Sequence, residues 1–214
     1  MQEFDLKEKM IHRLLLESPF VKDIGLWRGK MGIALFFFHQ GRASGCEVCT
    51  EAGEELLEEV WNQVHAELPF HFDSGLSGIG WGVEYLLQNR FIEGDGNEIC
   101  EEIDRKIMEI HIRRLQDPTL EKGSAGLYYY LSARIRGALS QHRAWPFDRE
   151  YLDDLSRANP VFAPARWQEF CARYPLSPAA WLNRAPIDET SYLSAPLGLR
   201  SGLAGYMLTQ TDCL

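Results

Sequence analysis

Apolar residues recur at helical spacing in three stretches of the chain, residues 6–15, 56–64 and 99–110. The first stretch stops before Ser18-Pro19, where a helix is expected to end. No stretch shows the strict alternation of apolar and polar residues that a half-buried strand would have. The pattern therefore predicts an all-α protein, with these three stretches as amphipathic helices that keep one side in solvent.

A second kind of segment lies between these stretches and occurs four times. Each copy reads apolar-x-x-Gly-x-x-Gly-apolar and leads into an apolar or aromatic run. Two glycines three residues apart leave a bare stripe on the first turn of a helix, so that another backbone segment can approach closely. The copies are Leu26–Ile33, Phe72–Ile79, Leu120–Leu127 and Leu199–Tyr206. We expect a buried helix to begin at the first glycine of each copy, Gly29, Gly75, Gly123 and Gly202.

The alternation of buried and amphipathic helices predicts stacked helical hairpins in one repeat domain that spans residues 1–214. The first glycines of the copies are 46, 48 and 79 residues apart. The longest interval contains a stretch, about residues 145–196, that holds seven of the ten prolines. We interpret this stretch as an irregular insertion with short helices at 148–157 and 165–173, because proline excludes long helices.

Composition narrows the classes of protein that fit. The chain has 214 residues, 45% of them hydrophobic, and a formal net charge of −9, which disfavours nucleic acid as a partner. The longest apolar run, Met31–Phe38, is far shorter than the roughly 20 residues of a membrane span. The N-terminus does not resemble a secretory signal, and five cysteines without regular spacing fit a reducing compartment. We expect a cytoplasmic protein.

The four motif stretches resemble the lanthionine synthetase C-like (LanC-like) family. They read GLWRGKMGIALFFF, DSGLSGIGWGVEYLL, EKGSAGLYYYLSAR and GLRSGLAGYML. The resemblance implies an α,α-toroid, in which inner helices begin at the glycine motifs and outer helices wrap around them. It also implies a role in the modification of ribosomally made peptides. Bacterial members add a cysteine thiol to a dehydrated serine or threonine, and a zinc ion holds the attacking thiolate.

The family's zinc ligands, two cysteines and a histidine, stand just before motif glycines. The corresponding pairs here are Trp27-Arg28, Asp73-Ser74, Glu121-Lys122 and Arg200-Ser201. We therefore expect no zinc, and a short relative whose four repeats form an incomplete or truncated ring. The fourth glycine helix would then lack a cover, so we expect it to pack on a partner, either a second copy in a homodimer or a missing C-terminal portion.

The residues ahead of the motif glycines are the candidate substrate-binding set, because the starts of the inner helices are expected to converge on one mouth. The set comprises Trp27, Arg28, His71, Asp73, Ser74, Glu121, Lys122, Arg200 and Ser201. Ordinary helix capping would also explain several of them. His71 could act as a base. No catalytic residue is assigned, and the expected partner is a peptide or protein.

Two functions from other classes remain open. One is a non-catalytic helical-repeat module that binds a protein. The other is a carbohydrate-active toroid with paired carboxylates drawn from Asp73, Glu84 and Glu121. Glu84 lies in an expected buried helix and needs a partner or a polar cavity there. Cys46 and Cys49, with His39 upstream, form a lone CxxC, which indicates zinc or redox chemistry only weakly.

Overall fold

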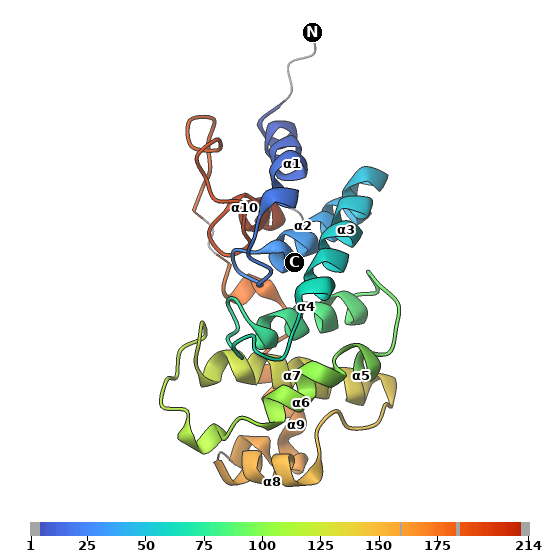
Figure 1. Ribbon diagram of the computed structural model, residues 1–214, viewed down its shortest axis with the longest axis vertical. Coiled ribbons are helices and arrows are strands. Elements are labelled where there is room, and N and C mark those ends of the chain that lie inside the picture. Colours follow the sequence, from blue (N-terminus) through green and yellow to red (C-terminus); the bar gives the residue numbers. More distant parts are fainter. Residues whose placement is uncertain (1–4, 159, 183–184, 211–214) are drawn as a thin grey trace. The chain divides into compact units, whose positions relative to one another are not determined.

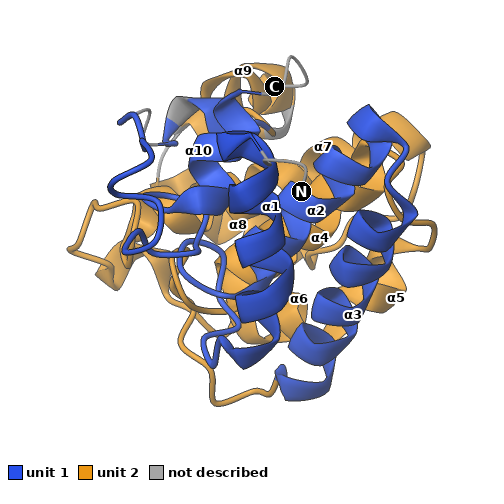
Figure 2. Cartoon of the chain, turned by 90° about the horizontal axis from the view of Figure 1, so that it is seen from above, with its two compact units in different colours: residues 1–64, 177–214 blue, residues 65–176 orange. Residues whose placement is uncertain are grey.

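The computed structural model describes residues 5–158, 160–182 and 185–210, and every regular element in these ranges is a helix (Figure 1). The all-α prediction is confirmed. The chain forms two compact units, coloured separately in Figure 2. Unit 1 combines residues 1–64 with 177–214, and unit 2 comprises residues 65–176. None of the described helices combines the length and the hydropathy needed to cross a membrane.

Unit 1 is built around an antiparallel hairpin of α2 and α3. Its helices are α1 (Leu6–Glu17), α2 (Lys30–Ser44), α3 (Glu47–Gln63) and α10 (Leu203–Thr209), with 3₁₀ turns at Ser18–Phe20 and Pro178–Ala180. Gly45 joins α2 to α3 in the left-handed conformation, with φ of +66°. The helix α2 is buried from Lys30 to Gly41, whereas α3 buries one side and exposes an acidic one. This pair matches the expected hairpin of a buried and an amphipathic helix.

The fourth glycine helix, α10, is covered within its own unit. Leu203, Met207 and Leu208 are buried, and α10 packs against α1 and α2. The expectation that this helix needs a partner to cover it is therefore wrong. The last repeat is not the open end of a row, because the C-terminal segment belongs to the same compact unit as the N-terminal hairpin.

Unit 2 contains the second and third glycine helices, which pack against each other. Its helices are α4 (Leu76–Gln88), α5 (Gly96–Ile99), α6 (Glu101–Met108), α7 (Ser124–Gln141), α8 (Arg149–Ala158) and α9 (Trp167–Arg173), with 3₁₀ turns at Ile112–Arg114, Pro160–Phe162 and Pro164–Arg166. The expected single helix at 99–110 is divided at Cys100 and ends at Met108. The short helices α8 and α9 match the prediction for the proline-rich stretch, which the two units share.

The four first glycines and the second glycines Gly32, Gly126 and Gly205 are needed because the preceding loop folds back over the first turn of each helix. A Cβ atom on Gly29 would lie 2.4 Å from the carbonyl oxygen of Asp23, and one on Gly32 would lie 2.0 Å from that of Leu26. The Lys30 N–H donates to the same Asp23 oxygen at 2.8 Å. The equivalent bonds in the other copies are Leu76 to Pro69 at 2.9 Å, Ser124 to Asp117 at 2.8 Å and Leu203 to Pro196 at 2.8 Å. The four copies of the motif therefore share one local structure.

Candidate functional site

We call the segment that ends at the first glycine of each motif a glycine loop. The four loops are residues 23–29, 69–75, 117–123 and 196–202. In unit 1 the first and fourth loops are joined directly. The carbonyl of Trp27 accepts hydrogen bonds from the N–H of Leu199 at 2.8 Å and from that of Arg200 at 3.1 Å. The backbones approach closely at Gly198, where a Cβ atom would lie 2.6 Å from the Arg28 Cα.

This pairing places a cation on an aromatic face. The Arg200 guanidinium carbon lies 3.6 Å from the centre of the Trp27 ring. The ring of Trp181 stacks on Trp27 with centroids 6.2 Å apart. Such a cation–π contact stabilises by about 0.5 to 2 kcal/mol, depending on how far it is desolvated. Trp27 is 5% exposed, and its indole nitrogen is buried without a hydrogen-bond partner among the described residues. Arg28 beside it is exposed.

In unit 2 the second and third glycine loops are joined in the same way. The carbonyl of Glu121 accepts hydrogen bonds from the N–H of Phe72 at 2.8 Å and from that of Asp73 at 3.1 Å. A Cβ atom on Gly126 would lie 2.4 Å from the Phe72 Cβ, so this loop also lies directly on the neighbouring helix start. The Ser74 hydroxyl donates to the Asp73 carboxylate at 2.8 Å.

Asp117, the first residue of the third glycine loop, adds another carboxylate to the loops of unit 2. Hydrogen bonds from Thr119 lower the pKa of Asp117, and the nearby charges of His71 and Lys122 lower it further. These two side chains therefore lie within electrostatic reach of a carboxylate at the start of the third loop. The loops of unit 2 carry both charge signs, and those of unit 1 carry the carboxylate of Asp23 as well as the cations Arg28 and Arg200 beside the ring of Trp27.

The two pairings have the same register. In each unit the N–H groups three and two residues before one first glycine donate to the carbonyl two residues before the other first glycine. The residues expected to bind substrate therefore stand on backbone that is fixed by repeated hydrogen bonds. Unit 1 holds Trp27, Arg28, Arg200 and Ser201, and unit 2 holds His71, Asp73, Ser74, Glu121 and Lys122. A single mouth shared by all four loops stays a prediction.

The residues ahead of the motif glycines do not fit the zinc that the resemblance implies. The two residues directly before each first glycine supply indole, guanidinium, carboxylate, hydroxyl and ammonium groups, but no thiolate or imidazole, and His71 is the one imidazole in the larger set. Across residues 5–158, 160–182 and 185–210, no group of three or more His, Cys, Asp or Glu side chains is placed to hold a metal ion. No chemical step is assigned to a metal here.

Cys46 and Cys49 lie at the start of α3, where the Cys46 sulfur accepts a hydrogen bond from the Cys49 N–H at 3.3 Å. This geometry is that of a helix cap. Burial raises the pKa of the Cys49 thiol to about 12, so the thiol stays protonated at neutral pH. Burial, with a smaller effect of Arg42, lowers the pKa of His39 to about 4.

A buried ionic network in unit 2 was not anticipated from the sequence, apart from Glu84. The Arg134 guanidinium donates to Glu84 Oε1 at 2.5 Å, to Asp104 Oδ2 at 2.5 Å and to Asn97 Oδ1 at 2.9 Å. The Tyr130 hydroxyl donates to Asp104 Oδ1 at 2.5 Å. Glu84 and Arg134 are each 1% exposed. The network ties α4, α6 and α7 together through charges that no solvent reaches.

Glu84 therefore has the partner that its position in a buried helix demanded. Its second oxygen accepts a hydrogen bond from the Gln88 side chain at 2.6 Å. Burial raises the pKa of Asp104, although its bonds from Arg134 oppose that shift. The sequence signal for this network was Arg134, the one charged residue of the run Leu131–Ile135, whose other members are apolar or small. A general acid must reach its substrate, so Glu84 is excluded as a catalytic carboxylate of a carbohydrate-active site.

Comparison with known proteins adds no assignment. No model of a protein family matches the chain, and no curated protein matches it.

Proposed function

We propose that the chain is a LanC-like protein that binds a ribosomally made peptide and uses its glycine loops as the binding surface. The observation that carries the proposal is the joined pair of loops in unit 1, which holds Arg200 against Trp27 and leaves Arg28 exposed at the same edge. The repeated register of the two loop pairs supports a surface built for extended chains.

The chemistry of this edge favours an acidic peptide segment. Guanidinium groups bind carboxylates through paired, charge-assisted hydrogen bonds. Arg200 is held by the Trp27 ring, so less side-chain entropy is lost when a carboxylate binds. The loops of unit 2, taken by themselves, carry the carboxylate of Asp73, which would favour a basic position of a peptide. The proposal is a binding role, without the zinc-dependent ring closure of the bacterial cyclases.

The experiment is a titration of the full chain with a fluorescently labelled synthetic peptide that carries glutamates, serines and cysteines. Fluorescence anisotropy gives the affinity. We expect the double variant Arg28→Gln, Arg200→Gln to bind about tenfold more weakly, because two charged hydrogen-bond donors are lost. Lys22→Gln, an exposed residue of the same unit, is the matched control and should bind as the unchanged protein does. Equal affinity of the double variant, or no saturable binding at millimolar protein, would contradict the proposal.

A further inference from the structure

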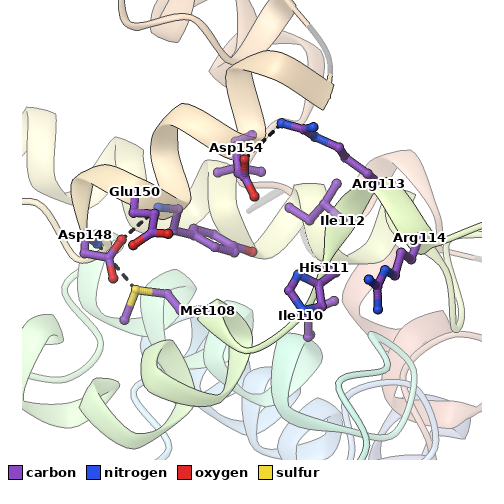
Figure 3. A pocket seen from close by; sticks show the side chains of 11 residues that line it. Met108, Ile110, His111, Ile112, Arg113, Arg114, Asp148, Glu150 and Asp154 are labelled. Atoms are coloured by element: carbon purple, nitrogen blue, oxygen red, sulfur yellow. Dashed lines mark hydrogen bonds and ion pairs between the residues drawn. The ribbon is translucent and has the colours of Figure 1, made fainter.

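Unit 2 contains a cavity of about 470 Å³ between the segment after α6 and α8, and none of its lining residues belongs to a glycine loop (Figure 3). This volume is in the range of pockets that bind small molecules. One wall consists of the basic residues His111, Arg113 and Arg114. In Figure 3, Asp148 and Glu150 lie on the opposite side of the cavity from Arg114. The cavity is therefore bounded by charges of opposite sign.

On the basic wall, one cation is already paired. Arg113 donates to the Asp154 carboxylate at 2.9 Å, and this ion pair largely neutralises both charges. Arg114 and His111 are exposed and make no ion pair within the described part of the chain. The wall thus keeps one guanidinium and one imidazole for a ligand.

On the acidic wall, Asp148 acts as the cap of α8, since its Oδ1 accepts the Tyr151 N–H at 2.8 Å. Glu150 is exposed and makes no ion pair among the described residues. The carboxylate that remains for a ligand is therefore that of Glu150. It lies in the first turn of α8, across the cavity from Arg114.

Between the walls the cavity is apolar, with one exception. Ile112 and Leu155 are buried and supply hydrocarbon. Tyr151 also lines the cavity and is 7% exposed, and its hydroxyl is buried without a hydrogen-bond partner in the described residues. Burial raises the pKa of this phenol, so the hydroxyl is protonated and available as a donor. A buried donor without a partner lowers the stability of the folded state, and a bound polar group would remove that cost.

We infer that this cavity binds a short peptide of two or three residues with both termini free. Its carboxylate would pair with Arg114 and His111, its ammonium group would pair with Glu150, and its side chains would cover Ile112 and Leu155. The Tyr151 hydroxyl would donate to a peptide carbonyl. A phosphate-bearing ligand would face three carboxylates, which disfavours it. This site does not depend on the proposed function of the glycine loops.

The test is calorimetric titration of the full chain with the dipeptide L-leucyl-L-leucine. We expect saturable binding that weakens by about tenfold when the dipeptide is amidated at its C-terminus or acetylated at its N-terminus. Arg114→Gln should abolish the effect of amidation, and Glu150→Gln should abolish the effect of acetylation. Arg149→Gln and Glu101→Gln change exposed residues that do not line the cavity, and they serve as matched controls. The variant Arg28→Gln, Arg200→Gln should bind the dipeptide normally, which separates this site from the glycine loops.

Tyr151→Phe distinguishes ligand binding from a structural role. Removal of the unpartnered hydroxyl should leave the melting temperature unchanged or raise it, while the affinity for the dipeptide falls about threefold to tenfold. The inference is overturned if the dipeptide does not bind at millimolar concentration. It is also overturned if the capped dipeptides bind as well as the free one, or if Arg114→Gln and Glu150→Gln leave the affinity unchanged.

Discussion

The buried network of unit 2 should be the most sensitive point of the fold, and Arg134→Met tests this. Methionine keeps the unbranched stem of the side chain but lacks the charged guanidinium, so the substitution leaves Glu84 and Asp104 buried without their shared cation. Two charge-assisted interactions are lost, each worth about 1.5 to 3 kcal/mol. Removal of one partner from a buried ion pair typically costs about 3 to 5 kcal/mol. We expect the free energy of unfolding to fall by that amount at pH 7.

The fall in the free energy of unfolding that Arg134→Met causes, which we call the deficit, should depend on pH in a defined direction. Burial already raises the pKa of Asp104, and the loss of Arg134 removes a contribution that lowers it. A carboxyl whose folded-state pKa lies above its unfolded value favours the folded state when it is protonated. The deficit of Arg134→Met should therefore be smallest at acidic pH and should grow as the pH rises through the folded-state pKa of Asp104.

The assay is urea denaturation followed by circular dichroism between pH 4.5 and 7.5, with hydrogen exchange of α4 and α7 to locate the effect. Arg105→Met is the matched control, because Arg105 pairs with Glu102 on the exposed side of α6, where solvent screens the pair and its loss should change stability little. Arg134→Lys keeps the positive charge but not the planar guanidinium, and its loss in free energy of unfolding should lie between the losses of Arg134→Met and Arg105→Met. A loss below about 1 kcal/mol for Arg134→Met, as for an exposed pair, or a deficit that does not change with pH, would refute the reasoning.

Two further predictions follow from local geometry. Gly205→Ala should destabilise by about 1 to 3 kcal/mol or prevent folding, because its Cβ would lie 1.6 Å from the Leu199 carbonyl oxygen. Gly53→Ala, whose nearest contacts would be 3.3 Å or more, should change stability by less than about 1 kcal/mol in thermal unfolding. Iodoacetamide at pH 8 should modify the half-buried Cys46 of the folded protein and spare Cys49, as read by peptide mass mapping. Equal labelling of both thiols would show that α3 opens at its start.

The positions of the helices followed from apolar spacing, and the glycine motifs located the starts of the buried ones. Gly29 and Gly202 begin helices as predicted, because a folded-back loop leaves no room for a side chain at those positions. The division of the 99–110 helix at Cys100 was missed, since isoleucine spacing alone cannot reveal a change of backbone direction. The packing of α10 on α1 and α2 was missed because it depends on the path of the long irregular segment before α10, which no local sequence pattern encodes.

The candidate site was predictable as a set of loops but not as pairs of loops. Motif matching placed Trp27 and Arg200 in the same set, but their cation–π contact arises from pairing between residues far apart in the chain. Arg134 and Asp104 were missed as a pair because neither position reveals its partner, and only packing shows that they form a buried ion pair. The cavity beside Tyr151 has no sequence signature, because its walls come from two separate segments of mixed composition.

Unit 1 combines two segments that are far apart in the sequence, and this affects the order in which the units can fold during translation. Residues 65–176 are contiguous, so unit 2 can fold as soon as its own segment has been made. The hairpin of α2 and α3 is complete by residue 63, but it must wait for α10, which begins at Leu203. At ordinary elongation rates that delay is on the order of ten seconds. During this time the surface of α2 that α10 and its loop will bury, which includes Gly32 against Leu199, is accessible to other chains, and the nascent protein should engage chaperones mainly through this hairpin.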